Sequence, residues 1–67
     1  MFYNYKNKKM ISLDKVVSIE MVESSRWYYL KIKYKSNIIE DTPATMDAKE
    51  VEEVYKELLN ILNEKKN

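Results

Sequence analysis

Aromatic rings and ammonium groups alternate along one segment, and these side chains are the ones best suited to bind something. Trp27 and Tyr29 share a period-two position with Lys31, and Lys33 and Lys35 continue the alternation. On a strand, such positions project from one face. Rings stack on bases at about 1–3 kcal/mol each while ammonium groups follow the phosphates, so this pattern is typical of single-stranded nucleic-acid platforms. Exposed aromatic side chains are also typical of protein–protein contacts.

The same face therefore allows three interpretations. In the leading one it is an interaction surface, for a second copy or a protein partner, made of Val22, Trp27 and Tyr29. The alternative is a single-stranded nucleic-acid contact made of Trp27, Tyr29, Lys31, Lys33 and Lys35. Lysines that point outward from a strand also deter edge pairing, so an ordinary solvated face is the third interpretation.

Composition argues against catalysis. The chain has 67 residues and contains no His, Cys or Gly, which excludes imidazole relays, thiolate metal sites and glycine-rich phosphate loops. Asp41, Asp47 and Glu50 could supply oxygen ligands to Mg²⁺ or Ca²⁺, but a helix cap accounts for the spacing of the last two. A small core also leaves little room for a substrate pocket of about 300 Å³. We expect no enzyme, metal or cofactor.

A C-terminal amphipathic helix is predicted over residues 47–64. Asp47 is the expected N-cap, Glu50 would complete a capping box, and Met46 would form a hydrophobic staple with Val51. The apolar positions recur at helical spacing and define one buried stripe. They are Val51, Val54, Tyr55, Leu58 and Leu62, widened by Leu59 and Ile61.

Residues 1–44 are predicted to form strands. A turn at Ser24–Ser25 would set apolar side chains of two strands opposite one another. The expected pairs are Met21 with Tyr28, Ile19 with Leu30, and Val17 with Ile32. A hairpin of residues 2–5 and 10–13, turning at Asn7–Lys8, is expected before them.

A second turn is predicted at Ser36–Asn37, because Asn tolerates positive φ where glycine is missing. Its expected pairs are Tyr34 with Ile39 and Lys33 with Glu40. Asp41 would then point inward, so we expect the strand to end or bulge there, and Pro43 to stop the ladder.

The expected fold is therefore a single α+β domain, residues 1–67: an antiparallel β-meander of four to five strands packed by one C-terminal helix. The helix would cover one face of the sheet and leave the other open. Because the chain is short and has no disulfide or metal to reinforce a marginal core, we expect a homodimer that covers the open face.

The net charge is +1, and no apolar run approaches the roughly 18 residues of a membrane span. We therefore expect a cytoplasmic protein. The bias towards lysine over arginine is typical of coding by an AT-rich bacterial or phage genome.

The run Ile11-Ser-Leu-Asp-Lys-Val-Val-Ser-Ile-Glu20, followed by a polar turn, two strands and a closing helix, resembles the later part of bacterial pleckstrin-homology-like domains over residues 11–63. The resemblance implies a binding scaffold for lipid or protein, with a partial sheet that another copy or a partner completes. The order of elements is also similar to that of small dimeric coactivator-like proteins that bind single-stranded DNA.

Overall fold

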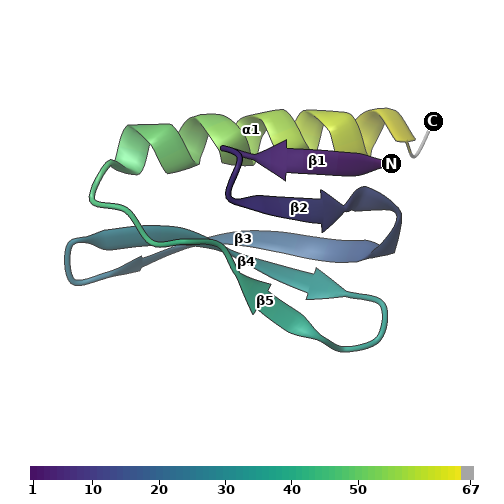
Figure 1. The fold of residues 1–67 in the computed structure, drawn as a ribbon, viewed down its shortest axis with the longest axis horizontal. Helices are drawn as coiled ribbons and strands as arrows, with labels where there is room; N and C mark the ends of the chain where they lie inside the picture. The colour runs from purple at the N-terminus through teal and green to yellow at the C-terminus, as the bar shows by residue number, and fades with distance from the viewer. Residues whose placement is uncertain (66–67) are drawn as a thin grey trace.

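The computed structural model describes residues 1–65 and contains five strands, a 3₁₀ helix and one α-helix (Figure 1). The elements are β1 (Phe2–Tyr5), β2 (Lys9–Ser12), η1 (Leu13–Lys15), β3 (Val16–Ser24), β4 (Trp27–Tyr34), β5 (Ile39–Asp41) and α1 (Ala48–Lys65). The predicted α+β class with a C-terminal helix packed on antiparallel strands is confirmed.

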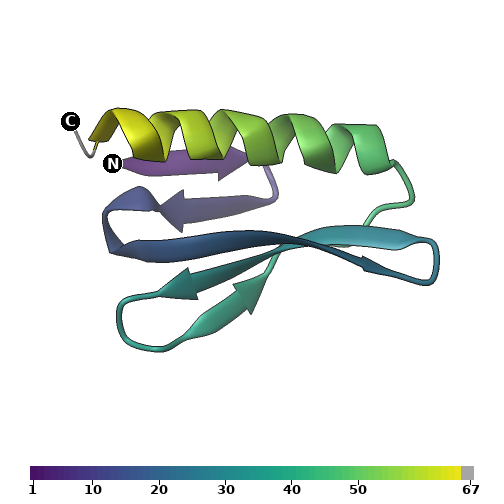
Figure 2. The same cartoon turned by 180° about the vertical axis from the view of Figure 1, so that it is seen from behind.

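The strands form two sheets instead of one meander. β1 and β2 make a two-stranded sheet, and β3, β4 and β5 make a three-stranded one in that order. The continuous meander thus has fewer strands than the predicted four to five. The division occurs because Leu13 turns into the core within η1, which separates β2 from β3. Figure 2 shows β1 beside α1, with β2 between β1 and the larger sheet.

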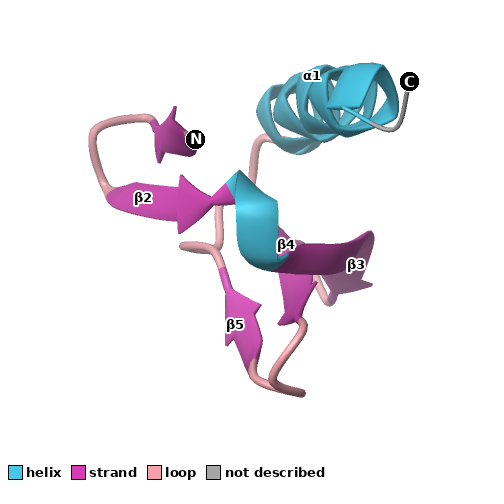
Figure 3. Cartoon of the chain, turned by 90° about the vertical axis from the view of Figure 1, so that its right-hand side faces the viewer, coloured by secondary structure: helices cyan, strands magenta, loops and turns pink. Residues whose placement is uncertain are grey.

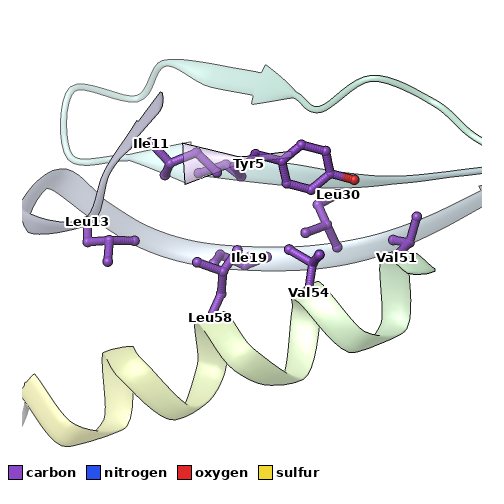
Figure 4. Close-up of a cluster of buried hydrophobic side chains, with 9 residues drawn as sticks. Tyr5, Ile11, Leu13, Ile19, Leu30, Val51, Val54 and Leu58 are labelled. Atoms are coloured by element: carbon purple, nitrogen blue, oxygen red, sulfur yellow. The ribbon is translucent and has the colours of Figure 1, made fainter. Parts of the chain in front are cut away.

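A single hydrophobic core joins the two sheets and the helix (Figure 4). Its buried members are Tyr5, Ile11, Leu13, Ile19, Leu30, Ile32, Val51, Val54 and Leu58. Tyr55, Ile61 and Leu62 pack around it half-buried, which confirms the predicted helical stripe. Its members come from both ends of the chain, so the core closes only when α1 docks.

The start of α1 follows the prediction in part. Asp47 is the N-cap, and its Oδ1 accepts hydrogen bonds from the backbone N–H groups of Lys49 at 3.1 Å and Glu50 at 3.2 Å. A capping box would also need the Glu50 side chain to accept a hydrogen bond from the Asp47 N–H. That part of the prediction is wrong, because Thr45 Oγ1 accepts this hydrogen bond instead. Met46 is 66 % exposed, so the predicted staple buries little surface.

The β3–β4 hairpin keeps the predicted faces but not the predicted register. The turn is Ser25–Arg26, and Met21 pairs with Leu30. Ile19 pairs with Ile32, so aliphatic side chains meet directly beneath α1. The register differs from the predicted one by two residues, which leaves the inward and outward sets unchanged.

Val17 is the exception on β3. A bulge between Val16 and Ser18 shifts the register, and Val16 packs on the core in its place. Val17 is 58 % exposed and does not face Ile32, so that predicted pair is wrong.

The β4–β5 pairing differs from the prediction by one residue. Ile32 pairs with Glu40 and Lys33 with Ile39. A one-residue slip exchanges the two faces of a strand, so Glu40 turns inward and Asp41 outward, the reverse of the prediction. Glu40 is held there by Tyr34 Oη at 2.8 Å and Lys9 Nζ at 2.6 Å. β5 ends at Asp41, as expected, but the prediction that Pro43 stops the ladder is wrong, because Tyr28 and Thr45 form an antiparallel bridge beyond it.

Left-handed backbone closes the turns of this glycine-free chain. Lys6 and Asn7 both have positive φ between β1 and β2, and the side chain of Asn4 hydrogen-bonds to Asn7. The predicted N-terminal hairpin is therefore present, with β2 displaced by one residue. Ser25 and Asn37 have positive φ in the other two turns, and the role predicted for Asn37 is confirmed.

Candidate interaction surface

The three-stranded sheet has one face under α1 and one face turned away from it (Figure 3). Successive side chains of a strand alternate between faces, and Leu30 and Ile32 are fully buried on the α1 side. We call the opposite side the outer face. Its residues in the paired strands are Ser18, Glu20, Val22 and Ser24 of β3, Trp27, Tyr29, Lys31 and Lys33 of β4, and Ile39 and Asp41 of β5.

An apolar patch occupies the end of the outer face near the β3–β4 turn. Val22 and Tyr29 are directly opposite one another and half-buried. Trp27 lies one row further along, opposite Ser24, and is 48 % exposed. The three residues predicted as an interaction surface thus lie together. An indole beside a phenol combines two of the side chains that are enriched in interface hot spots.

Charged side chains occupy the middle of the outer face. Lys31 lies between Glu20 on β3 and Asp41 on β5 in the cross-strand register. Carboxylates directly opposite a lysine lower the positive potential that it presents to an anion. Lys33 lies between Ser18 and Ile39. The outer face thus carries two ammonium groups and two carboxylates.

Lys35 does not belong to the outer face. Its backbone N–H donates to the carbonyl oxygen of Lys15 at 2.9 Å, beyond the end of β4, and it lines a groove against α1. The predicted set of Lys31, Lys33 and Lys35 is therefore only partly on the paired strands, because β4 ends at Tyr34 and the period of two ends with it.

Sequence reasoning did not single out three of the charged and apolar members of the outer face. Asp41 was expected to point inward and Ile39 to face Tyr34, and the β5 slip reverses both. Ile39 is 58 % exposed beside Lys33. Glu20 follows from the alternation of β3 and could have been placed on this face from the sequence, since Val22 was.

A groove of about 380 Å³ lies between η1, the start of β3 and the C-terminal half of α1. Its walls are mainly apolar, with Asp14, Ser18, Lys35 and Asn63 among them. The small core was expected to leave little room for a space of about 300 Å³, and the groove exceeds that volume.

The carboxylates considered as metal ligands do not converge. Asp47 caps α1, Asp41 lies opposite Lys31, and Glu50 Oε1 lies 3.9 Å from Lys6 Nζ. Within residues 1–65, no group of three or more acidic side chains is arranged to hold a metal ion.

Tyr34 and Glu40, on the α1 side of the sheet, have shifted pKa values. On the α1 side, burial and the hydrogen bond to Glu40 raise the pKa of Tyr34 to about 12. Hydrogen bonds from Lys9 and then Tyr34 hold the pKa of Glu40 below its usual value. This cluster connects β2 to the larger sheet and is explained by that structural role.

In the part of the chain that the structure describes, no helix is both long enough and apolar enough to cross a membrane. Comparisons of the chain with protein-family models, curated proteins and solved structures find no match. The resemblance to pleckstrin-homology-like domains therefore stays a prediction, and the function has to be argued from the outer face itself.

Proposed function

We propose that this chain is a small non-enzymatic interaction module of the cytoplasm that contacts another polypeptide, a second copy or a protein partner, through its outer face. One observation carries the proposal: Trp27 is half-exposed next to Tyr29 and Val22 on a sheet face that α1 does not cover. Tryptophan and tyrosine are the residues most enriched where binding energy concentrates.

The balance of charge favours a polypeptide over nucleic acid as the partner. Binding to phosphates needs several cations that are free to release counterions. The outer face offers Lys31 and Lys33, and Lys31 lies between two carboxylates. Lys35, the third cation of the alternative interpretation, lies at the groove instead.

Oxidative footprinting tests the proposal without knowledge of the partner. Trp27 and Tyr29 should be oxidised more slowly in an extract of cells that produce the chain than in dilute purified protein. Phe2 and Met10, both exposed on the separate two-stranded sheet, are internal controls and should react equally in the two samples. Equal oxidation of Trp27 in both samples would refute the proposal. Protection that nuclease treatment removes would establish the nucleic-acid alternative in its place.

A further inference from the structure

The outer face of residues 1–65 is arranged in rows that cross the strands. The first row pairs Ser24 with Trp27, and the second pairs Val22 with Tyr29. The third sets Lys31 between Glu20 and Asp41, and the fourth sets Lys33 between Ser18 and Ile39. Successive rows are two residues apart, which is about 6.6 Å along a strand. The aromatic and apolar side chains thus lie next to the β3–β4 turn, and the charged side chains lie further from that turn.

We propose that the outer face binds a second copy of this chain, face to face and with the strands of the two copies antiparallel. The twofold axis crosses the strands at the row of Val22 and Tyr29. This inference rests on the proposed function, because it names the polypeptide that the outer face contacts. The contact is isologous, so each residue pair occurs twice.

Complementarity between the cation of Lys31 and the aromatic ring of Trp27 is the reason for a second copy and for this orientation. With the axis at the second row, the third row of one copy faces the first row of the other. Lys31 then lies over the exposed indole of Trp27, which is a cation–π geometry, and Glu20 faces the hydroxyl of Ser24. Each copy therefore supplies both the cation and the aromatic ring that the contact needs.

Repulsion between like charges excludes the parallel orientation of the two copies. A twofold axis along β4 would place Lys31 on Lys31 and Glu20 of one copy on Asp41 of the other. Like charges brought together in an interface cost free energy and exclude that orientation. Antiparallel packing also leaves Lys33 beyond the partner's turn, in solvent. The overlap of three rows is small, so we expect a weak, concentration-dependent dimer.

Single-cysteine variants test the arrangement, because the chain contains no native cysteine. Facing sheets pack about 10 Å apart, and Val22 would face its own counterpart at that distance. The two copies of Lys33 would be about 26 Å apart along the strands. A short bismaleimide should therefore cross-link Val22→Cys at high protein concentration, and should not cross-link Lys33→Cys. Glu53→Cys, on the exposed side of α1, is the control for random collision.

Two further variants sharpen the result. Trp27→Ala added to Val22→Cys should abolish the cross-link. In sedimentation equilibrium, Lys31→Gln removes the contact twice and should raise the dimer dissociation constant about five- to thirtyfold, and Lys31→Arg should leave it unchanged because arginine keeps the cation.

The outcomes separate this inference from the proposed function. Efficient cross-linking of Lys33→Cys would overturn the antiparallel arrangement. A single 8.1 kDa species at every concentration would overturn the second copy as partner. In either case, protection of Trp27 in the cell extract would still support the proposed function, and loss of that protection would refute it.

Discussion

The two faces of the three-stranded sheet are built from the same strands and differ in what covers them. Leu30 and Ile32 on one face are fully buried under α1. On the other face of the same strand, Trp27 is 48 % exposed and Tyr29 is half-buried. One ladder of backbone hydrogen bonds supports both. The alternation of a strand therefore places the core residues on one face and leaves the other face uncovered by α1. Substitutions on the two faces should consequently have separable effects.

Truncation beneath α1 should have the largest effect. Leu30→Ala removes a fully buried side chain and should lower the free energy of unfolding by about 2–5 kcal/mol. Tyr29→Ala, the adjacent residue on the outer face, should cost less than about 1 kcal/mol in dilute solution. Urea unfolding followed by circular dichroism measures both. Equal losses would show that the two faces are not divided as described.

Thr42 tests whether the inner side depends on polar as well as apolar contacts. It is buried, and its Oγ1 accepts a hydrogen bond from the Leu30 N–H at 2.9 Å. Thr42→Val leaves that donor unsatisfied and should cost about 1–3 kcal/mol. Thr42→Ser keeps the hydroxyl and should retain most of the stability. If the serine and valine variants melt together, the hydrogen bond contributes nothing.

The turn between β3 and β4 offers a change that touches neither face. Ser25 has φ of 51°, which costs a residue with a Cβ about 1 kcal/mol or more, and glycine avoids most of that cost. Ser25→Gly should stabilise the fold by about 0.5–1 kcal/mol, measured as a rise in Tm, with dimerisation unchanged. Ser36→Gly, at a position outside the left-handed region, should give no gain. A gain at Ser36 as large as that at Ser25 would contradict this explanation.

The smallest predicted effect is a pH dependence that belongs to the inner side. The pKa of Glu40 lies below its ordinary 4.5, so its contribution to stability is present above that pH. It is lost as the pH falls through the folded-state pKa. Glu40→Gln should flatten the acid limb of a Tm-against-pH curve, and an unchanged slope would contradict the assignment.

The contribution of Tyr34 to stability has the opposite pH dependence, because the pKa of Tyr34 is raised to about 12 from the ordinary 10.0. Its contribution is present below pH 10.0 and is lost as the pH rises towards the folded-state value. Tyr34→Phe should remove that alkaline loss in the same measurement.

The sequence was sufficient for features that depend on periodicity alone. The helical stripe, the Asp47 cap and the separation of Leu30 from Tyr29 across β4 follow from periods of 3.6 and 2. Register was less predictable, because a turn can move by one residue without changing the local pattern. The slip at β5 reversed Glu40 and Asp41, and it allows Lys9, which is remote in the sequence, to pair with Glu40 on the inner side of the sheet.

The candidate surface was predictable to the same extent. Its aromatic patch follows from alternation along β3 and β4. Its charge balance depends on which residue of β5 lies beside Lys31, and on where β4 ends before Lys35. Both are decided by contacts between segments that the pattern of one strand does not contain. The sequence therefore located the patch but overstated its positive charge.

The fluorescence of Trp27 tests the central claim most directly, because it is the only tryptophan in the chain and lies on the outer face. Acrylamide quenching should be measured over a wide range of protein concentration. The account predicts strong quenching in dilute solution and progressive protection as the concentration rises and the outer face becomes covered. Quenching that is equally strong at every concentration, or an indole that is already shielded in the dilute monomer, would contradict it.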